Sequence, residues 1–208
     1  MANVLFIKAN GRPDDQAVSL QLFNTFKAQY VENHPEDHIE EIDLFAENLP
    51  YYDNDKITAM FKAGKGMELT EEEEKEAAYV KSYVDQFMRA DKIVLAFPLW
   101  NFSVPAVLHT YFDYLCQAGT TFRYTANGPE GLLNGKQAFL LNARGGVYSE
   151  GPAAGMEMAV TYVTKIMNFL GIEDTQEVIV EGHNQFPDKA EEIIEAGLEE
   201  AKEAAVTF

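Results

Sequence analysis

Three separate segments of the sequence contain residue types that could together hold a phosphorylated planar ligand. The first runs from Asn10 to Ser19 and leads into a predicted helix, where Ala17 and Val18 would offer backbone N–H groups and Ser19 a hydroxyl. N–H groups at a helix N-terminus attract a phosphate, because the helix macrodipole is positive there. Arg12 is the only cation of this segment. A serine near a helix start is equally typical of an ordinary N-cap, so the segment alone leaves both interpretations open.

The second segment contains the only tryptophan of the chain, Trp100, between Pro98 and Pro105. It reads Pro98-Leu99-Trp100-Asn101-Phe102 and follows an apolar run that is typical of a buried strand. A planar aromatic ligand needs a rigid wall, apolar contacts for its faces and amide groups for its edge, and this segment offers all three. Packing of the aromatic side chains in the core is the alternative interpretation.

The third segment follows another apolar run and contains two adjacent glycines. It begins with Asn142, Ala143 and Arg144, continues with Gly145 and Gly146, and includes Tyr148. Glycines let the backbone approach a ring closely and direct N–H groups toward it. Such donors would stabilise the negative charge that a reduced flavin carries. A mobile glycine loop is the alternative.

The elements that must position these segments alternate along the chain. Apolar runs predict strands, and apolar residues at helical spacing predict helices between them. Strands are expected over residues 4–9, 39–44, 91–97, 136–142 and 177–181. Helices are expected over residues 16–30, 70–89, 105–115, 156–170 and 188–205. Residues 45–54 are expected to form a loop, and residues 119–135 a hairpin-like flap.

Three of the predicted helices carry clear end signals. Thr70 and Glu73 have the spacing of a capping box, and the helix that follows should turn five side chains inward: Ala77, Val80, Val84, Phe87 and Met88. Pro105 suits the first turn of the helix over residues 105–115. Gly171 suits the end of the helix over residues 156–170.

Five strands that alternate with helices predict a doubly wound parallel sheet of the α/β class, covered on both faces. The chain has neither the G-x-G-x-x-G fingerprint after its first strand nor a G-x-x-x-x-G-K-[ST] motif. This absence favours the flavodoxin-like strand order 2-1-3-4-5 in one domain over residues 1–208. In that order a ligand binds outside the carboxyl ends of the strands, between the first and the third, where the three segments would meet.

Bulk properties exclude several classes of function. The 208 residues carry a formal net charge of −18, which disfavours contact with nucleic acids and with anionic membrane surfaces. No apolar stretch approaches the ~18 residues that a membrane span needs. The single cysteine, Cys116, excludes an internal disulfide and fits a reducing compartment, so a cytoplasmic location is expected. His34 and His38 are interrupted by Pro35 and have no third ligand nearby, so no metal site is predicted.

Five motifs occur in the same order as in a known family. They are Lys8-Ala9-Asn10, Pro98 to Phe102, Ala118 to Thr125 with Gly128 to Gly131, Ala143 to Gly146, and Glu181-Gly182-His183. On these motifs the chain resembles the FMN-dependent NADH:azoreductases and quinone reductases, the Gram-positive form in particular, over nearly its whole length. Many relatives have Ser or Met where this chain has Ala17, Leu99 and Ala143, positions that act mainly through their backbones.

The resemblance implies a noncovalently bound FMN. Its phosphate contacts match Ala17, Val18 and Ser19, and its ring contacts match residues 99–102 and 143–146. The full set of expected cofactor contacts is Asn10, Ala17, Val18, Ser19, Pro98, Leu99, Trp100, Asn101, Phe102, Asn142, Ala143, Arg144, Gly145, Gly146 and Tyr148.

The resemblance also implies a homodimer with two active sites at its interface. Phe122, Tyr124 and Phe169 are the aromatic residues expected to line the pocket for acceptors such as azo compounds and quinones. The expected reaction is a ping-pong cycle in which a hydride passes from NADH or NADPH to flavin N5 and the acceptor then takes two electrons. No side chain is expected to act as an essential general acid, because the cofactor carries the redox chemistry.

Two other functions remain open from the sequence. A flavodoxin-type carrier would share the fold, the cofactor and the acidity, but would stabilise a one-electron state. A regulatory module of the same fold would bind no flavin at all. The extra length, the flap and the apolar residues around Trp100 favour the enzyme over the carrier.

Overall fold

The computed structural model describes residues 1–208 and contains a five-stranded parallel sheet. Its order is β2 (His38–Asp43), β1 (Asn3–Lys8), β3 (Lys92–Pro98), β6 (Gln137–Arg144) and β7 (Asp174–Glu181). This order confirms the predicted flavodoxin-like arrangement, with β2 at one edge. The prediction that residues 1–208 form one domain stays a prediction.

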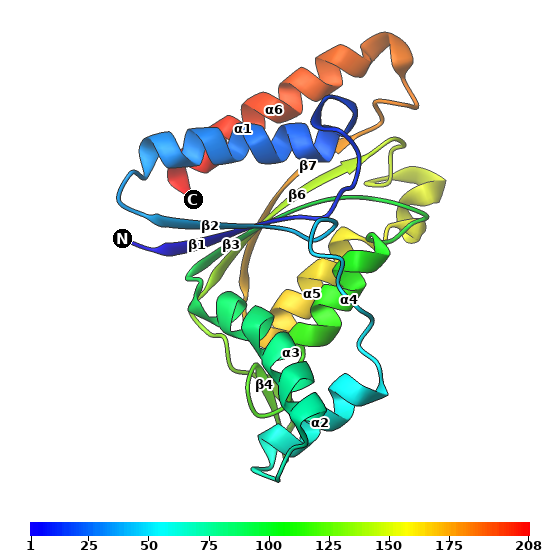
Figure 1. Ribbon diagram of the computed structural model, residues 1–208. Helices are drawn as coiled ribbons and strands as arrows, with labels where there is room; N and C mark the ends of the chain where they lie inside the picture. The colour runs from blue at the N-terminus through cyan, green and yellow to red at the C-terminus, as the bar shows by residue number, and fades with distance from the viewer.

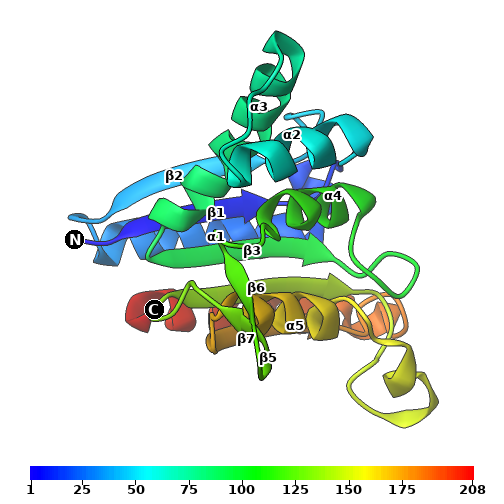
Figure 2. The ribbon, with the colours of Figure 1, turned by 90° about the horizontal axis from the view of Figure 1, so that it is seen from below.

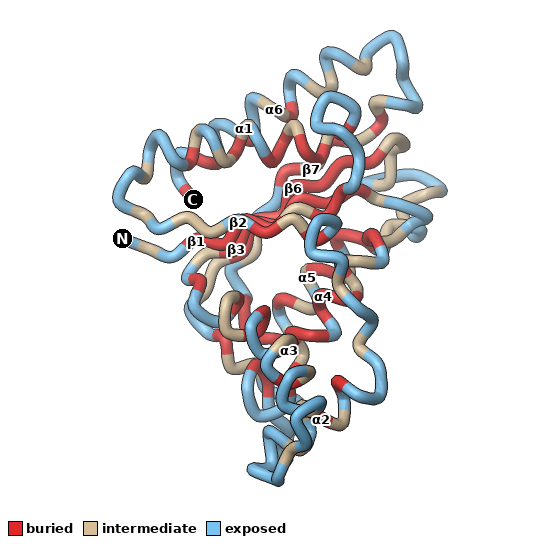
Figure 3. Tube along the Cα trace, viewed as in Figure 1, coloured by how far each residue is buried: buried red, intermediate tan, exposed pale blue.

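Helices cover both faces of the sheet (Figure 1). α1 (Val18–Asn33) and α6 (Ala190–Thr207) lie on one face, and α3 (Glu71–Arg89), α4 (Ala106–Leu115) and α5 (Val160–Leu170) lie on the other. The buried residues accordingly form two clusters, and the central strands are the most continuously buried part of the chain (Figure 3). Strands buried on both faces explain why these segments read as unbroken apolar runs.

α3 begins as predicted, because Thr70 and Glu73 form the complete capping box. The Thr70 hydroxyl accepts from the backbone N–H of Glu73, and the Glu73 carboxylate accepts from the backbone N–H of Thr70. The inward face was predicted correctly except for Met88, which lies exposed beside the buried Phe87. Adjacent residues of a helix are rotated by about 100° from each other, so Met88 points away from the core that Phe87 meets.

The sequence analysis assigned no element to residues 55–69, where the structure contains α2 (Asn54–Gly64). Asp53 caps this helix by accepting from the backbone N–H of Lys56. Its apolar side chains are few, and two of them, Ile57 and Phe61, are exposed. The sequence therefore shows no continuous apolar face that would predict a helix. α2 packs on α3 and is held there by ion pairs, one of which joins Lys62 to Glu73.

Three helices begin later than predicted because a short 3-10 turn precedes each. The turns are Asp14–Gln16 before α1, Gly151–Met156 before α5 and Pro187–Lys189 before α6. Pro105 is the N-cap of α4 and does not belong to its first turn. Gly171 ends α5 in the left-handed conformation, with φ of 96°, as its type predicts.

The flap is a hairpin, as predicted. β4 (Phe122–Thr125) pairs antiparallel with β5 (Gly128–Gly131). Figures 1 and 2 show it on the face of α3, α4 and α5, beyond these helices and away from the sheet.

None of the helices combines the length and the apolarity that crossing a membrane requires. No group of three or more His, Cys, Asp or Glu side chains is placed to hold a metal ion.

Gly197 permits the close approach of α6 to β7, because a Cβ at this position would lie 2.1 Å from Cγ2 of the buried Val180. Alanine normally stabilises a helix by about 1 kcal/mol relative to glycine. At Gly197 we expect Gly197→Ala to lower the free energy of unfolding, because overpacking costs about 1–3 kcal/mol. Urea denaturation measures this difference. Gly64→Ala in α2 is the matched control, since a Cβ there meets nothing within 4 Å, and it should stabilise the protein. A stabilised Gly197→Ala variant would contradict the prediction.

Candidate functional site

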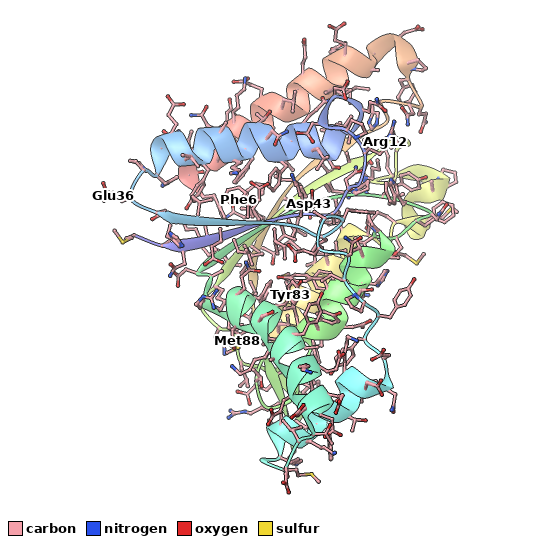
Figure 4. All side chains as sticks on the ribbon, in the orientation of Figure 1. Phe6, Arg12, Glu36, Asp43, Tyr83 and Met88 are labelled. Atoms are coloured by element: carbon pink, nitrogen blue, oxygen red, sulfur yellow. The ribbon has the colours of Figure 1, made fainter.

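A cavity of about 400 Å³ opens at the carboxyl ends of the central strands. β1 leads into α1 on one face of the sheet and β3 into α4 on the other, so the two connections diverge here (Figure 1). Arg12, at this edge in Figure 4, is one of the lining residues. The three segments singled out in the sequence all meet in this cavity, and the loop after β7 joins them.

At one end of the cavity the N-terminus of α1 offers unused hydrogen-bond donors. Its N-cap is Ala17, which makes no side-chain cap, and its first turn contains no acidic residue. The backbone N–H groups of Ala17, Val18 and Ser19 donate no hydrogen bond within the chain. The buried Ser19 hydroxyl accepts from Nδ2 of Asn10 at 3.0 Å, which leaves its own proton free to donate. The ordinary N-cap considered for Ser19 is therefore not what the structure shows.

A tight turn after β3 forms one wall of the cavity. Pro98, Leu99 and Trp100 line it, and the backbone N–H of Leu99 donates to the carbonyl of Ala143 at 3.0 Å. Trp100 is 38% exposed, so it is not a core side chain. Its ring packs edge-to-face against Phe45 with 6.1 Å between ring centroids. The Trp100 ring thus provides a large aromatic surface beside the cavity, and the hydrogen bond from Leu99 fixes the backbone before it to β6.

The loop after β6 contributes Ala143 and Gly145 to the lining. A Cβ at Gly145 would lie 2.4 Å from Nδ2 of Asn184, so a close approach between two loops requires this glycine. The Gly145 carbonyl accepts from the backbone N–H of Asn184 at 3.0 Å. The N–H groups of Gly145 and Gly146 donate nowhere within the chain and remain available to a ligand.

Arg144 supports this loop from below. Its side chain is 4% exposed and lies between two carboxylates, with Nε 3.0 Å from Glu181 and Nη1 3.8 Å from Glu157. Glu181 also accepts from the backbone N–H groups of Tyr148 and Ser149. Burial alone would raise the pKa of Glu181, but these hydrogen bonds and Arg144 hold that pKa below its ordinary value. The charged pair therefore fixes the conformation of the glycine loop.

Glu157 fastens the same cluster to α5. It accepts from the backbone N–H groups of Ala159, Val160 and Thr161 at the helix start. Burial favours the neutral acid, but the hydrogen bonds outweigh burial and keep the pKa of Glu157 below its ordinary value.

The structure brings most of the expected cofactor contacts into one cavity. Nine of them line it: Asn10, Ala17, Val18, Ser19, Pro98, Leu99, Trp100, Ala143 and Gly145. Six others lie outside the lining: Asn101, Phe102, Asn142, Arg144, Gly146 and Tyr148. The fully buried Asn142 donates from Nδ2 to the carbonyl of Phe97 at 2.9 Å. The rings of Phe102 and Tyr148 contact each other, with 6.4 Å between centroids. Contact between any of these residues and a cofactor stays a prediction.

The loop after β7 contributes residues that were not among the expected cofactor contacts, although support of the glycine segment by His183 was one of two roles left open from the sequence. His183 and Asn184 line the cavity, and the preceding Gly182 has φ of 84°, which favours glycine. Nδ1 of His183 is buried without a hydrogen-bond partner, and burial lowers the pKa of this ring. The Glu181-Gly182-His183 motif was the available signal, but nothing in the sequence placed it beside the phosphate-binding segment. Gln16, Gln21, Asp15 and Ile194 complete the lining that was not expected.

The expected acceptor-pocket residues lie elsewhere in the chain. Phe122 and Tyr124 line a second cavity of about 610 Å³ between the hairpin and α2, which shares no residue with the first. Phe169 packs against Phe122, with ring centroids 4.5 Å apart. Within one chain, therefore, these aromatics do not line the cavity at the strand ends.

Comparison with known proteins agrees with this geometry. Residues 2–205 match the family described as having a flavodoxin-like fold. The chain is 60% identical to an FMN-dependent NADH:quinone oxidoreductase of Brevibacillus brevis and 54% identical to FMN-dependent NADH:quinone oxidoreductase 1 of Bacillus subtilis. Both alignments cover 100% of each chain over 208 residues.

Two solved structures are also similar. The azoreductase from Bacillus anthracis strain Sterne superimposes with a TM-score of 0.96 at 59% identity, covering 100% of both chains. An FMN-dependent NADH-azoreductase from Bacillus anthracis Ames Ancestor, solved in complex with FMN, gives 0.91 at 33% identity, covering 99% of this chain and 98% of that one. The chain therefore belongs to the family of FMN-dependent NADH:quinone oxidoreductases and azoreductases, enzymes built on the flavodoxin-like fold.

Proposed function

We propose that this protein is an FMN-dependent oxidoreductase that transfers two electrons from NADH to quinones and azo compounds. The observation that carries the proposal is the uncapped N-terminus of α1, whose free N–H groups open into a cavity with an aromatic wall. Relatives of 54–60% identity that are named for this activity support it. No specific observation favours an electron carrier.

The end of the cavity at α1 fits a phosphate. Three backbone N–H groups without partners, from Ala17 to Ser19, are available at the positive end of a 16-residue helix. Phosphate binding at a helix N-terminus needs no further cation, although Arg12 lies in the same lining. These hydrogen-bond donors therefore match the phosphate group of FMN.

The other end fits a planar ring with a polar edge. Leu99 and Trp100 provide apolar surface, and the free N–H group of Gly145 provides a donor. A volume of about 400 Å³ lies within the ordinary range of cofactor sites. We propose the fifteen residues expected from the sequence as the cofactor contacts, with His183 and Asn184 added.

The chemistry that FMN supplies when bound is two-electron transfer through N5 in a ping-pong cycle, in which NAD leaves before a quinone or azo compound takes the electrons. The task of the protein is to hold and orient the ring and to exclude competing reactions. The cavity lining contains no side chain that has both a perturbed pKa and a hydrogen-bond partner that could relay a proton. We therefore propose that the protons come from water. NADH is the proposed donor, on the names of the relatives, and use of NADPH is not excluded by any residue.

We further propose a homodimer in which the hairpin of one chain covers the cavity of the other. The hairpin and α2 expose an apolar patch that we call the α2 patch, formed by Ile57, Phe61 and Tyr124. Trp100 and Phe102 expose apolar surface at the mouth of the cavity. Burying both surfaces in one symmetric interface would explain why each is exposed in the single chain. The free thiol of Cys116 fits the reducing cytoplasm, the proposed location.

Anaerobic titration of the purified protein with NADH, followed by a quinone, tests the activity. We expect the visible flavin absorbance to bleach in one phase with one NADH per FMN and to return in full when the quinone is added. A flavin that does not react with NADH, or that passes through a radical absorbance band, would favour an electron carrier. A protein that stays colourless after FMN is added would overturn the site itself.

Gln16 allows a test of the phosphate end, because it is exposed, lines the cavity and directly precedes Ala17. Gln16→Glu keeps the shape of the side chain and adds one negative charge. We expect the Kd for FMN to rise about three- to tenfold and the Kd for riboflavin, which has no phosphate, to stay unchanged. Flavin fluorescence quenching measures both.

Gln16→Ala is the matched control for this variant, since it removes the amide without adding charge. The effect of Gln16→Glu should shrink in high salt, because salt screens exposed charges. An equal loss of affinity for FMN and riboflavin would place the phosphate elsewhere.

Phe61→Arg tests the proposed dimer by placing a charge in the α2 patch, where Phe61 is 61% exposed. We expect the unsubstituted protein to sediment at twice 23.3 kDa and the variant to sediment as a monomer with lower quinone reductase activity. Val31→Arg is the control, because Val31 is also exposed but lies on α1, on the opposite face of the sheet. A monomeric unsubstituted protein with full activity would refute the proposal.

A further inference from the structure

We propose that His109 is a positioning residue of this site, which acts through Ser103 to hold the turn that carries Trp100. The inference rests on the proposed function for its effect on the cofactor, but its effect on the turn can be measured without one.

The turn from Trp100 to Ser103 is strained. Trp100 and Ser103 exchange backbone hydrogen bonds, N–H to carbonyl, at 2.9 and 3.1 Å. The two residues between them, Asn101 and Phe102, have φ of 49° and 71°. Two successive residues with positive φ form the kind of tight turn in which Asn-Gly is preferred, and phenylalanine in the second position is costly. Strain of this kind persists only where the surroundings impose it.

Two contacts outside the turn impose this conformation. Nε2 of His109, on α4, lies 3.2 Å from the Ser103 hydroxyl. The backbone N–H of Met158, just before α5, donates to the carbonyl of Phe102 at 2.9 Å. The His109 side chain thus holds the turn at its last residue, Ser103, and the backbone of Met158 holds it at Phe102. Of the two, only the His109 contact can be removed by a substitution without rebuilding the chain.

His109 is itself held in place. Its ring packs on the ring of Tyr162, from α5, with 4.7 Å between centroids. Tyr162 also packs against Phe112, one turn further along α4. His109 therefore transmits the packing of α4 on α5 to the turn. Because a hydroxyl can donate or accept, the Ser103 hydroxyl can bond to Nε2 of His109 in either tautomer of the ring.

Loss of this bond should affect the aromatic wall and leave the phosphate end intact. Without the anchor the turn can relax toward unstrained backbone angles, and Trp100 would leave its place beside Leu99 in the lining. The N-terminus of α1 does not contact His109, so the donors from Ala17 to Ser19 would keep their geometry. The expected signature is therefore an equal loss of affinity for FMN and for riboflavin.

The test is a double-mutant cycle of Ser103→Ala and His109→Leu, read first by the fluorescence of Trp100. Trp100 is the only tryptophan of the chain and lies in the turn itself, so its emission reports the turn in the protein without FMN. We expect both single variants to shift the emission alike, the double variant to shift it no further, and His109→Gln, which keeps a hydrogen-bonding group, to restore it. The second readout is the Kd for FMN and for riboflavin, expected to rise about three- to tenfold for both.

Additive effects of the two substitutions would show that His109 acts only by packing on Tyr162, and would overturn the proposal. Unchanged emission in His109→Leu would do the same. His38→Leu is the control, since His38 is exposed at the start of β2, and it should change neither readout. If the unsubstituted protein binds no flavin, the proposed function fails, but the emission cycle still decides whether His109 positions the turn.

Discussion

The whole arrangement depends on the divergence of α1 and α4 to opposite faces of the sheet from the adjacent strands β1 and β3. Neighbouring parallel strands whose connections separate in this way leave a crevice at their carboxyl ends that no side chain of the sheet fills. The first turn of α1 begins in this crevice, and its N–H groups have no intrahelical partner. A protein that served only as a scaffold would cap them, because unpaired polar groups cost stability. Here the N-cap is Ala17, which cannot cap, so the donors are left for a ligand.

This constraint explains how a chain of net charge −18 can accommodate a phosphate. The positive charge comes from the backbone and the macrodipole of α1, and it does not depend on a cluster of Lys and Arg. Arg12 is the only cation in the lining, while Arg144 is occupied by Glu157 and Glu181. Arg144 therefore contributes rigidity to the glycine loop and little free charge to the cavity. A site built from backbone dipoles keeps its geometry because the helices and strands hold it.

Features that depend on local sequence were predictable, and those that depend on tertiary contact were not. The five strands, the capping box at Thr70 and the three loops follow from apolar periodicity and turn chemistry, which act over a few residues. α2 was missed because it exposes Ile57 and Phe61, two of its few apolar side chains. The predicted strand order already put the loop after the fifth strand beside the fourth, but only the structure shows that His183 and Asn184 reach Gly145 and the cavity. Arg144 was expected among the ring contacts from the family resemblance, and only the structure shows its two carboxylate partners.

The strained turn and the distant hairpin are two solutions to one problem, that a flat ring needs walls on several sides while a parallel sheet supplies only an edge. One wall comes from the turn at Trp100. The positive φ angles of this turn cost free energy, which hydrogen bonds from α4 and from the segment just before α5 offset. The hairpin of the same chain does not provide an opposite wall, since Phe122 and Tyr124 line a separate cavity. Phe122 is buried, but Tyr124 is 75% exposed next to α2, and this exposure has no stabilising role within one chain. In the proposed homodimer a second copy of the chain would provide that wall, so association and catalysis would depend on the same apolar surfaces.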